Sequence, residues 1–172
     1  MNAIHVVHPF EPVYDCGSRV LILGSLPSVL SRENRFYYGH PQNRFWRVLA
    51  AVFSEAVPQT IEEKTALLLR NGVALWDAVA ACDVAGSSDA SIRNVTPTDL
   101  ARIFDACRIE AVFANGRTAA KFYDKYQKPL YGRPITVLPS TSPANAAWST
   151  ERLTEAWRVI NSASTALPDP TA

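Results

Sequence analysis

The sequence predicts an α/β protein with three layers, in which helices cover both faces of a central, mainly parallel four-stranded sheet. Short apolar runs with the composition of buried parallel strands recur at residues 19–25, 72–77, 110–116 and 134–138. Segments with helical periodicity separate them, and this alternation is typical of parallel crossover units. The length of 172 residues, with no linker, suits one domain with a single core. We treat residues 1–172 as that domain and expect 165–172, which contain two prolines and no core residues, to be a flexible tail.

The helices are predicted from periodicity and capping signals. One is expected from Asn43 to about Val57, because apolar residues at 46, 49, 50 and 53 fall on one face. Thr60 and Glu63 form a capping box for a second helix that reaches Arg70. Further helices are expected to open at Thr96-Pro97 and at Arg117, and an apolar stripe at 153, 157 and 160 marks the last helix.

Composition and charge describe a globular protein but do not identify its partner. Hydrophobic content of 48%, charged content of 19% and a net charge of +1 describe a globular protein and do not decide for or against a DNA partner. Basic residues gather at 32–47 and 117–133, and charge alone favours two solvated helix faces there. The N-terminus lacks a signal-peptide pattern and no apolar run approaches a membrane span, so we expect a cytoplasmic protein, associated with the nucleoid if prokaryotic.

The cysteines and histidines predict no bound metal. Three cysteines with wide spacing suggest neither a disulfide framework nor an iron–sulfur cluster, and small apolar packing is expected for Cys82 and Cys107. His5, His8 and His40 match no zinc pattern. Phosphate-binding, dinucleotide-binding and nucleophile-elbow motifs are also absent from the sequence. We therefore expect no cofactor.

Unusual residues follow the predicted strands. In open α/β sheets ligands bind beyond the carboxyl ends of the strands. Those ends are predicted at 24–28, 76–82, 115–118 and 139–143, and all of them should converge on one edge of the sheet. They offer amides, hydroxyls, an Asn and one carboxylate, which suit hydrogen bonding to a heterocycle and to phosphates.

The stretch "FYYGHPQNRFW", residues 36–46, crowds five aromatic rings around an Asn. Core packing is the expectation for Tyr37, Phe45 and Trp46, as it is for Trp76. His40 is expected to be a structural hydrogen-bonding group beside Pro41. Asn43 could serve only as the N-cap of its helix, Asp77 could cap a helix after its strand, and residues 140–142 could form an ordinary turn.

Five segments in order, "GSLPS", "YYGHPQNRFW", "LWD", "NG" and "LPSTSPANAAWS", resemble the DNA-deoxyinosine glycosylases, the hypoxanthine-excising branch of the uracil-DNA glycosylase superfamily. The likeness runs from about Phe10 to about Ile160. It implies that Asn43 is the catalytic residue, in place of the Asn that mismatch-specific relatives carry where this chain has Leu26. It also implies a base-binding group and a DNA-binding group. The base-binding group is Gly24, Ser25, Leu26, Tyr38 and Asp77; the DNA-binding group is Asn115, Gly116, Ser140, Thr141, Ser142, Pro143, Ala144 and Asn145.

The resemblance implies a monofunctional DNA glycosylase that flips a deaminated base out of DNA, hydrolyses its N-glycosidic bond and so begins base excision repair. Hypoxanthine is the expected substrate, with uracil or xanthine as others, and a monomer is expected. An ionised Asp77 would accept the N1–H of hypoxanthine or the N3–H of uracil and repel the N1 lone pair of adenine. Two alternatives stay open: a uracil- or mismatch-preferring glycosylase of the same superfamily, and an inert module that binds damaged or single-stranded DNA.

Overall fold

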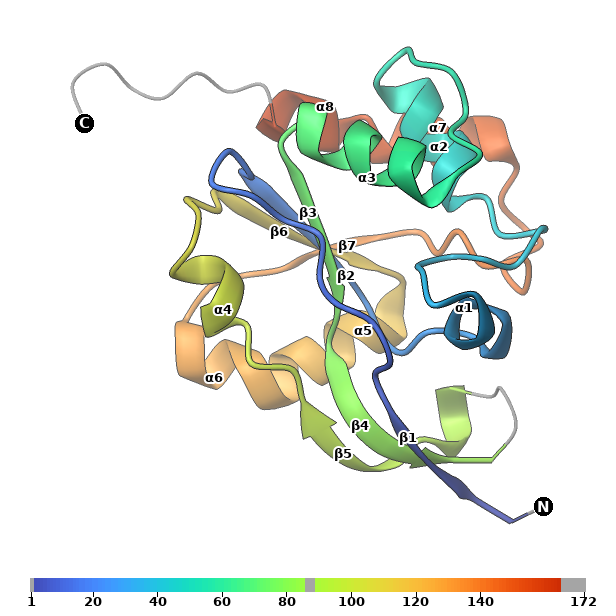
Figure 1. The fold of residues 1–172 in the computed structure, drawn as a ribbon, viewed down its shortest axis with the longest axis vertical. Coiled ribbons are helices and arrows are strands. Elements are labelled where there is room, and N and C mark those ends of the chain that lie inside the picture. Colours follow the sequence, from blue (N-terminus) through green and yellow to red (C-terminus); the bar gives the residue numbers. More distant parts are fainter. Residues whose placement is uncertain (1, 86–88, 165–172) are drawn as a thin grey trace.

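The computed structural model describes residues 2–85 and 89–164, so the expected tail at 165–172 lies outside the described residues (Figure 1). Its centre is a four-stranded sheet in the order β3-β2-β6-β7, with every neighbouring pair parallel. The strands are β2 (Val20–Gly24), β3 (Val73–Asp77), β6 (Ala111–Asn115) and β7 (Thr136–Leu138). The predicted parallel sheet is therefore confirmed.

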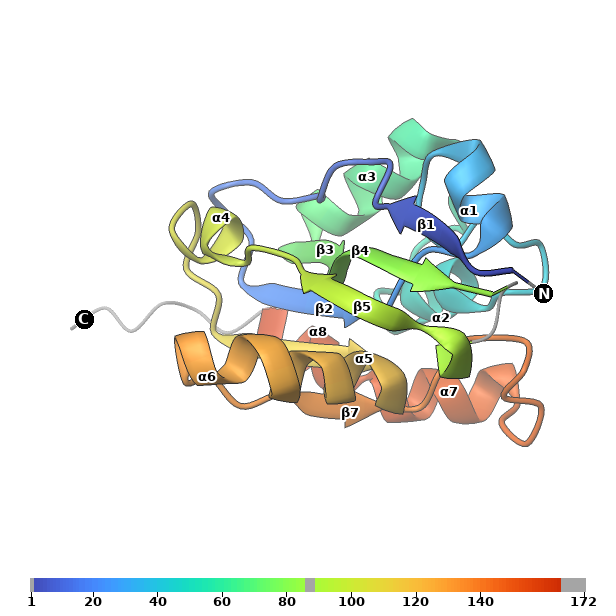
Figure 2. The ribbon, with the colours of Figure 1, turned by 90° about the horizontal axis from the view of Figure 1, so that it is seen from below.

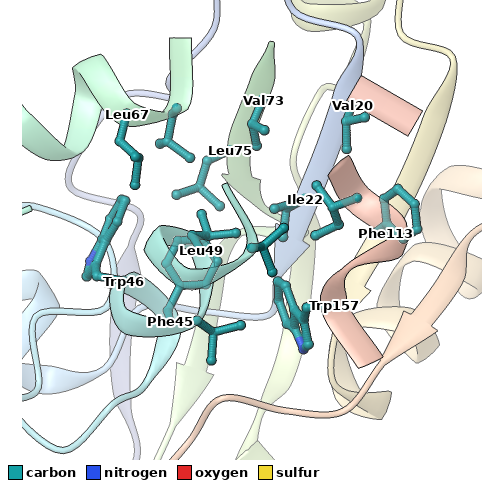
Figure 3. Close-up of a cluster of buried hydrophobic side chains, with 14 of the residues drawn as sticks. Val20, Ile22, Phe45, Trp46, Leu49, Leu67, Val73, Leu75, Phe113 and Trp157 are labelled. Carbon is teal, nitrogen blue, oxygen red and sulfur yellow. The ribbon is translucent and has the colours of Figure 1, made fainter. Parts of the chain in front are cut away.

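Side chains of successive strand residues point to opposite faces, which gives the sheet two separate cores. On β2, Val20 and Ile22 join one cluster, whereas Leu21 and Leu23 join the other. The larger cluster packs the sheet against Phe45, Leu49 and Trp157 (Figure 3). All four β2 side chains are fully buried, so the strand reads as a continuous apolar run rather than an alternating one.

Helices cover both faces of the sheet, which completes the predicted three layers (Figures 1 and 2). The larger cluster lies beneath α2 (Phe45–Val52), α3 (Ile61–Arg70), α7 (Thr150–Trp157) and α8 (Val159–Ser164). The opposite face carries α4 (Ala101–Phe104), α5 (Arg117–Phe122) and α6 (Lys128–Tyr131), with a π-helical turn at Tyr123–Gln127 between the last two. The short helix α1 (Val29–Asn34) follows the loop after β2. No helix within the described ranges is both long and apolar enough to span a bilayer.

A second, antiparallel sheet was not predicted. It consists of β1 (Ile4–Val7), β4 (Val79–Val84) and β5 (Arg93–Pro97) in the order β1-β4-β5, with a 3-10 turn at Asp89–Ser91 (Figure 2). The expected loop at 76–82 is wrong, because the chain leaves β3 at Asp77 and enters β4 after Ala78 alone. The inward side chains of β4 pack with Val6 and Ile92 in a small core of their own.

The helix expected to open at Thr96-Pro97 is also wrong. Both residues pair with β4, and helix α4 begins only at Ala101. Proline is tolerated at the end of this edge strand, where its missing N–H breaks no central ladder. The Thr96-Pro97 pair does not distinguish the two structures, because proline occurs both in the first turn of a helix and at the end of an edge strand.

The boundaries of the two helices before β3 differ in how well they were predicted. Helix α2 starts at Phe45 rather than Asn43 and ends at Val52, because Ser54 adopts a left-handed conformation with φ of 55°. The capping box of α3 is confirmed: Thr60 accepts a hydrogen bond from the Glu63 amide, and the Glu63 carboxylate accepts one from the Thr60 amide. Core positions are confirmed for Tyr37, Phe45 and Trp46, and both Cys82 and Cys107 are buried.

Candidate active site

A cavity of about 850 Å³ opens at the carboxyl ends of the central strands. All of the predicted site residues except Gly116 and Asn145 line it. They come from the loops after β2, β6 and β7, from the end of β3 and from the aromatic segment before α2. The convergence of the strand ends on one edge is therefore observed. Other lining residues are Val29 and Arg32 of α1, Val84 of β4, and Ile92, which directly precedes β5.

Asn43 is held by the loop that follows β7. Its Oδ1 accepts hydrogen bonds from the Phe45 amide and from the Thr141 hydroxyl, each at 2.9 Å. Thr141 is tied in turn to Asn115: the Asn115 Nδ2 donates to Thr141 Oγ1, and the Thr141 amide donates to Asn115 Oδ1, each at 3.0 Å. Both lone pairs of the Asn43 carbonyl are thus occupied. The group that Asn43 can offer to a ligand is its Nδ2, which only donates.

The Asn43 side chain does part of the work of a helix cap, although Arg44 occupies the N-cap position of α2. A side-chain carbonyl that accepts an amide of the first turn satisfies one of the unpaired donors of a helix N-terminus. Asn43 is therefore not the N-cap residue itself, but its side chain satisfies one amide of the first turn. This contact is compatible with a second role for Nδ2 in the cavity.

Arg44 fastens the loop at residues 140–148, which we name the β7–α7 loop. Its guanidinium donates to the backbone carbonyls of Ser142, Asn145 and Trp148, and its amide donates to that of Thr141. A planar guanidinium with five N–H groups suits such a cluster of acceptors. Arg44 thus belongs to the loop's framework rather than to a solvated helix face, whereas Arg47 on the same helix is exposed.

Tyr38 lies between the aromatic core and the cavity. Its ring stacks on Phe45 with the centroids 4.1 Å apart, and its backbone is left-handed with φ of 53°. Its hydroxyl is buried without a hydrogen-bond partner among the described residues. Burial, followed by the carboxylate of Asp77, raises the pKa of Tyr38 well above its usual value. One face of the ring is already covered, so only the other is free to stack on a base.

Asp77 ends β3 with its side chain over Gly24, and it is only 3% exposed. Any Cβ on Gly24 would collide with Asp77 Oδ1 and lie 2.9 Å from the Tyr38 hydroxyl. The other carboxylate oxygen, Oδ2, lies 2.7 Å from the Nε2 of His8. The Thr98 hydroxyl donates to the Asp77 carbonyl at 2.7 Å and fixes the backbone. Asp77 caps no helix, because strand β4 follows it, so that alternative is wrong.

The loop after β2 joins the two sheets. Leu26 packs against the small core of the second sheet and also lines the cavity. The Ser25 carbonyl accepts the Val79 amide, and the Ser28 hydroxyl caps α1 by accepting the Ser31 amide. Ser25 and Leu26 therefore shape the wall, and Leu26 contributes no hydrogen-bonding group.

Gly116 and Asn145 support the site from outside the cavity. Gly116 has a φ of 92°, and a Cβ there would lie 3.2 Å from that of Ser140, so this glycine lets the β6–α5 turn approach the β7–α7 loop. Asn145 folds back into its own loop, with its Nδ2 donating to the Ser140 carbonyl. The tip of the loop, including Pro143 and Ala144, is exposed instead.

Sequence reasoning missed the roles of His8 and Arg44. His8 directly follows β1 of the second sheet, which was not expected, and it contacts Asp77 across 69 residues, so nothing near His8 in the sequence indicated this contact. By its charge, Arg44 is recognisable in the sequence only as one of the basic residues at 32–47. Its position beside Asn43, at the start of an amphipathic helix, was a usable signal that it would face inward. Within residues 2–85 and 89–164 no group of three metal-ligating side chains is arranged to hold an ion.

The comparisons with known proteins agree with this geometry. Residues 11–161 match the model of the Uracil DNA glycosylase superfamily. A hypoxanthine DNA glycosylase of Methanosarcina acetivorans is 33% identical over 88% of this chain and 95% of its own length. One of Methanosarcina barkeri is 34% identical over 79% and 86%. A solution NMR structure of a candidate uracil DNA glycosylase from M. acetivorans superposes with a TM-score of 0.76 at 33% identity, covering 89% of this chain and 95% of that one. The chain therefore belongs to the uracil DNA glycosylase superfamily, whose members act on DNA in repair, and it is a DNA glycosylase.

Proposed function

We propose that the protein removes deaminated bases from DNA, hypoxanthine first, as a monofunctional glycosylase that leaves an abasic site. The observation that carries the proposal is the meeting of a carboxylate, that of the buried residue Asp77, and an amide donor, Asn43 Nδ2, in one cavity at the sheet edge. The names of the two Methanosarcina relatives support hypoxanthine as the substrate. A cavity of about 850 Å³ also has room for a purine and its sugar.

In a duplex the target base is stacked and paired, so it cannot enter the cavity. The nucleotide must therefore first be extruded from the duplex. Extrusion costs a few kcal/mol of unstacking and unpairing. The exposed tip of the β7–α7 loop, including Pro143 and Ala144, is the part of the site best placed to fill the space left in the duplex. The Gly116 amide is buried and donates to the Leu138 carbonyl at 2.9 Å, so the Asn115-Gly116 turn supports the neighbouring β7–α7 loop and does not offer this amide to a phosphate. Contacts of the loop tip with DNA then offset the cost of flipping.

Asn43 is proposed to position water rather than to deprotonate it. As the glycosidic bond breaks, the base leaves with negative charge and the sugar becomes oxocarbenium-like, so it reacts with water that no base has activated. The proton that this water then loses neutralises the departing base. The Nδ2 of Asn43 can donate to the water oxygen, which leaves a second lone pair free to attack C1′. Orientation is then the main contribution of the residue, because an amide cannot accept a proton. The hydrogen bond from Thr141 fixes the rotamer that Nδ2 needs.

Asp77 is proposed to read the departing base. Its Oδ1 has no hydrogen-bond partner among the described residues, and Asp77 lines the cavity. An acceptor at this point matches hypoxanthine N1–H or uracil N3–H and opposes the bare N1 of adenine. Asp77→Asn should therefore lower both excision and the preference for deaminated bases. Full retention of both would contradict this role.

The absence of a Schiff-base step is part of the proposal. No lysine lines the cavity within the described residues, so the enzyme is expected to leave the phosphodiester backbone intact. Strand breaks that form without alkali or a lyase would contradict monofunctional action. A cytoplasmic location and a monomeric state are also part of the proposal.

The deciding experiment is a panel of labelled duplexes that carry hypoxanthine, uracil, xanthine or a G·T mismatch. Each is incubated with the wild type, with Asn43→Ala and with Asn34→Ala, an exposed asparagine on α1 that serves as the control. We expect hypoxanthine to be excised fastest, the Asn43→Ala variant to lose excision and the control to match the wild type. Preference for uracil or the mismatch would favour the first alternative. No product from any duplex, with binding retained, would favour the inert DNA-binding module.

A further inference from the structure

His8 and Asp77 form a buried pair behind the proposed base-reading position. Their side chains are 6% and 4% exposed, and the contact joins His8 Nε2 to Asp77 Oδ2 at 2.7 Å. The other ring nitrogen, Nδ1, lies 2.8 Å from the Phe10 carbonyl. The imidazole also packs edge-on against the Phe10 ring with the centroids 4.6 Å apart. Both nitrogens and the ring plane are therefore fixed.

The contacts determine where the protons of this pair lie. A backbone carbonyl only accepts, so Nδ1 must carry a proton. Exactly one further proton then has to lie between Nε2 and Oδ2. Either the imidazolium donates to the carboxylate, or the carboxylic acid donates from Oδ2 to a neutral imidazole. In both arrangements the pair has no net charge, and Asp77 Oδ1 carries no hydrogen.

We propose that His8 makes Asp77 Oδ1 an obligate hydrogen-bond acceptor and thereby sets the discrimination between deaminated bases and adenine. The inference rests on the proposed function. A carboxyl group can otherwise present either an acceptor or an O–H donor to a ligand. His8 holds the proton on the Oδ2 side, so the cavity is offered only an acceptor. Hypoxanthine and uracil supply the matching N–H, and the ring nitrogen of adenine does not.

Loss of His8 should change what Asp77 can bind. A buried carboxylate that lacks an opposite charge or a donor is driven to take up a proton. That proton would be free to sit on Oδ1, where it can donate to the N1 lone pair of adenine. The site would then tolerate the base it is meant to reject. His8 is a positioning residue in this scheme, because it acts through Asp77 and lies behind it.

The test compares two variants with a matched control. His8→Phe keeps a ring that can pack on Phe10 and removes both nitrogens, whereas His8→Gln keeps an N–H that can reach Asp77 Oδ2. The control is His5→Phe, because His5 forms a pair with Asp83 at 2.9 Å on the surface, with side chains 63% and 31% exposed. Affinity is measured for duplexes that carry 2′-fluorinated inosine or adenosine nucleotides, whose glycosidic bonds resist cleavage.

The wild type should bind the inosine duplex more tightly than the adenosine duplex. In His8→Phe this ratio should fall by about tenfold, in His8→Gln it should recover most of the wild-type value, and in His5→Phe it should not change. An unchanged ratio in folded His8→Phe would overturn the inference, and so would an equal loss in His8→Gln. If His8→Phe does not fold, the ratio in His8→Gln decides alone: a wild-type ratio supports the inference and a collapsed one overturns it. A wild type that neither discriminates nor excises a deaminated base would instead refute the proposed function.

Discussion

Gly24 lies where the Asp77 carboxylate, the Tyr38 hydroxyl and the main chain meet. A methyl group at this position has no room, because Asp77 Oδ1 and Tyr38 Oη occupy the space it would need. The absence of a side chain is therefore a requirement of the site and not of the backbone, since φ at Gly24 is not in the left-handed region. Substitution at this position should therefore lower activity as well as stability.

Gly24→Ala should displace Asp77 and lower the rate of hypoxanthine excision by about a hundredfold. The added methyl overpacks the site, so the free energy of unfolding should fall by about 1–3 kcal/mol. Gly17→Ala is the matched control, since its Cβ would meet only the Asp15 carboxylate at 3.3 Å in an exposed turn. Single-turnover kinetics and urea unfolding give the two quantities. Equal excision rates in both variants would refute the steric account.

Thr141 tests whether the orientation of Asn43 matters. Thr141→Val keeps the shape and removes the hydroxyl that donates to Asn43 Oδ1 and accepts from Asn115. We expect the single-turnover rate to fall by about tenfold, with DNA affinity little changed, because the amide is free to rotate. Thr141→Ser keeps the hydroxyl and should recover most of the rate. A wild-type rate in Thr141→Val would show that Asn43 needs no such partner.

At the scale of single residues, sequence reasoning identified the cavity and not its internal bonding. The resemblance to the deoxyinosine glycosylases indicated Tyr38, Asn43 and Asp77, and these do line one cavity. The pairing of Asp77 with His8, and of Asn43 with Thr141, joins positions 69 and 98 residues apart. Such contacts depend on how the elements pack, so no local pattern encodes them.

At the scale of elements, the β7–α7 loop, which is the proposed DNA contact, is held in shape by a residue of another segment. Its carbonyls converge on the Arg44 guanidinium, which links the loop to the start of α2. Asn43 precedes Arg44 directly, so one short segment of chain orients both the amide and the loop. The loop is thereby coupled through adjacent backbone to Asn43, the proposed catalytic residue.

Arg44→Met should loosen this loop. Without the guanidinium, amide hydrogen exchange across residues 142–148 should accelerate, because the loop then samples open states. DNA affinity should fall by about tenfold, equivalent to about 1.4 kcal/mol, because the loop must then be ordered on binding. Arg47→Met, an exposed position on the same helix, controls for the loss of charge. Weaker binding with unchanged exchange would mean that Arg44 contacts DNA directly.

Element boundaries show where local patterns stop being informative. Helix α3 was predicted to within a residue, because its capping box is a signal contained in four residues. The second sheet was missed because β4 follows β3 after one residue, so that two strands read as one strand and a loop. Strands β4 and β5 are defined by their antiparallel pairing in the folded protein, which includes a register shift between Ala81 and Asp83. No local sequence pattern indicates this pairing.

At the scale of the whole molecule, the layered architecture followed from the order of apolar runs and helices, whereas the site depends on both sheets. The central sheet supplies Gly24, Asp77 and Asn115, and the N-terminal region beside the second sheet supplies His8. The second sheet also places Val84 and Ile92 on the cavity wall. The cavity is thus a property of the assembled fold, and its polar groups become buried only when both sheets have formed.

That burial predicts how global stability depends on pH. Burial raises the pKa of Tyr37 and of Tyr38 well above the usual value near 10, and the Asp77 carboxylate adds to both shifts. Below about pH 10 both phenols are neutral in the folded and unfolded states, so they contribute no pH dependence. Above it the unfolded chain loses these protons first. The free energy of unfolding should therefore fall with rising pH, by up to about 1.4 kcal/mol per pH unit for each tyrosine.

Two phenylalanine variants separate this effect from lost hydrogen bonds. The Tyr38 hydroxyl has no partner among the described residues, so Tyr38→Phe should keep or slightly raise stability at neutral pH and make the alkaline slope less steep. The Tyr37 hydroxyl donates to the Glu11 carbonyl at 2.9 Å, so Tyr37→Phe should cost about 1 kcal/mol at neutral pH and reduce the slope similarly. Urea unfolding between about pH 8 and about pH 11 measures both quantities. An alkaline slope that neither variant reduces would show that these two phenols do not titrate on unfolding as their burial requires.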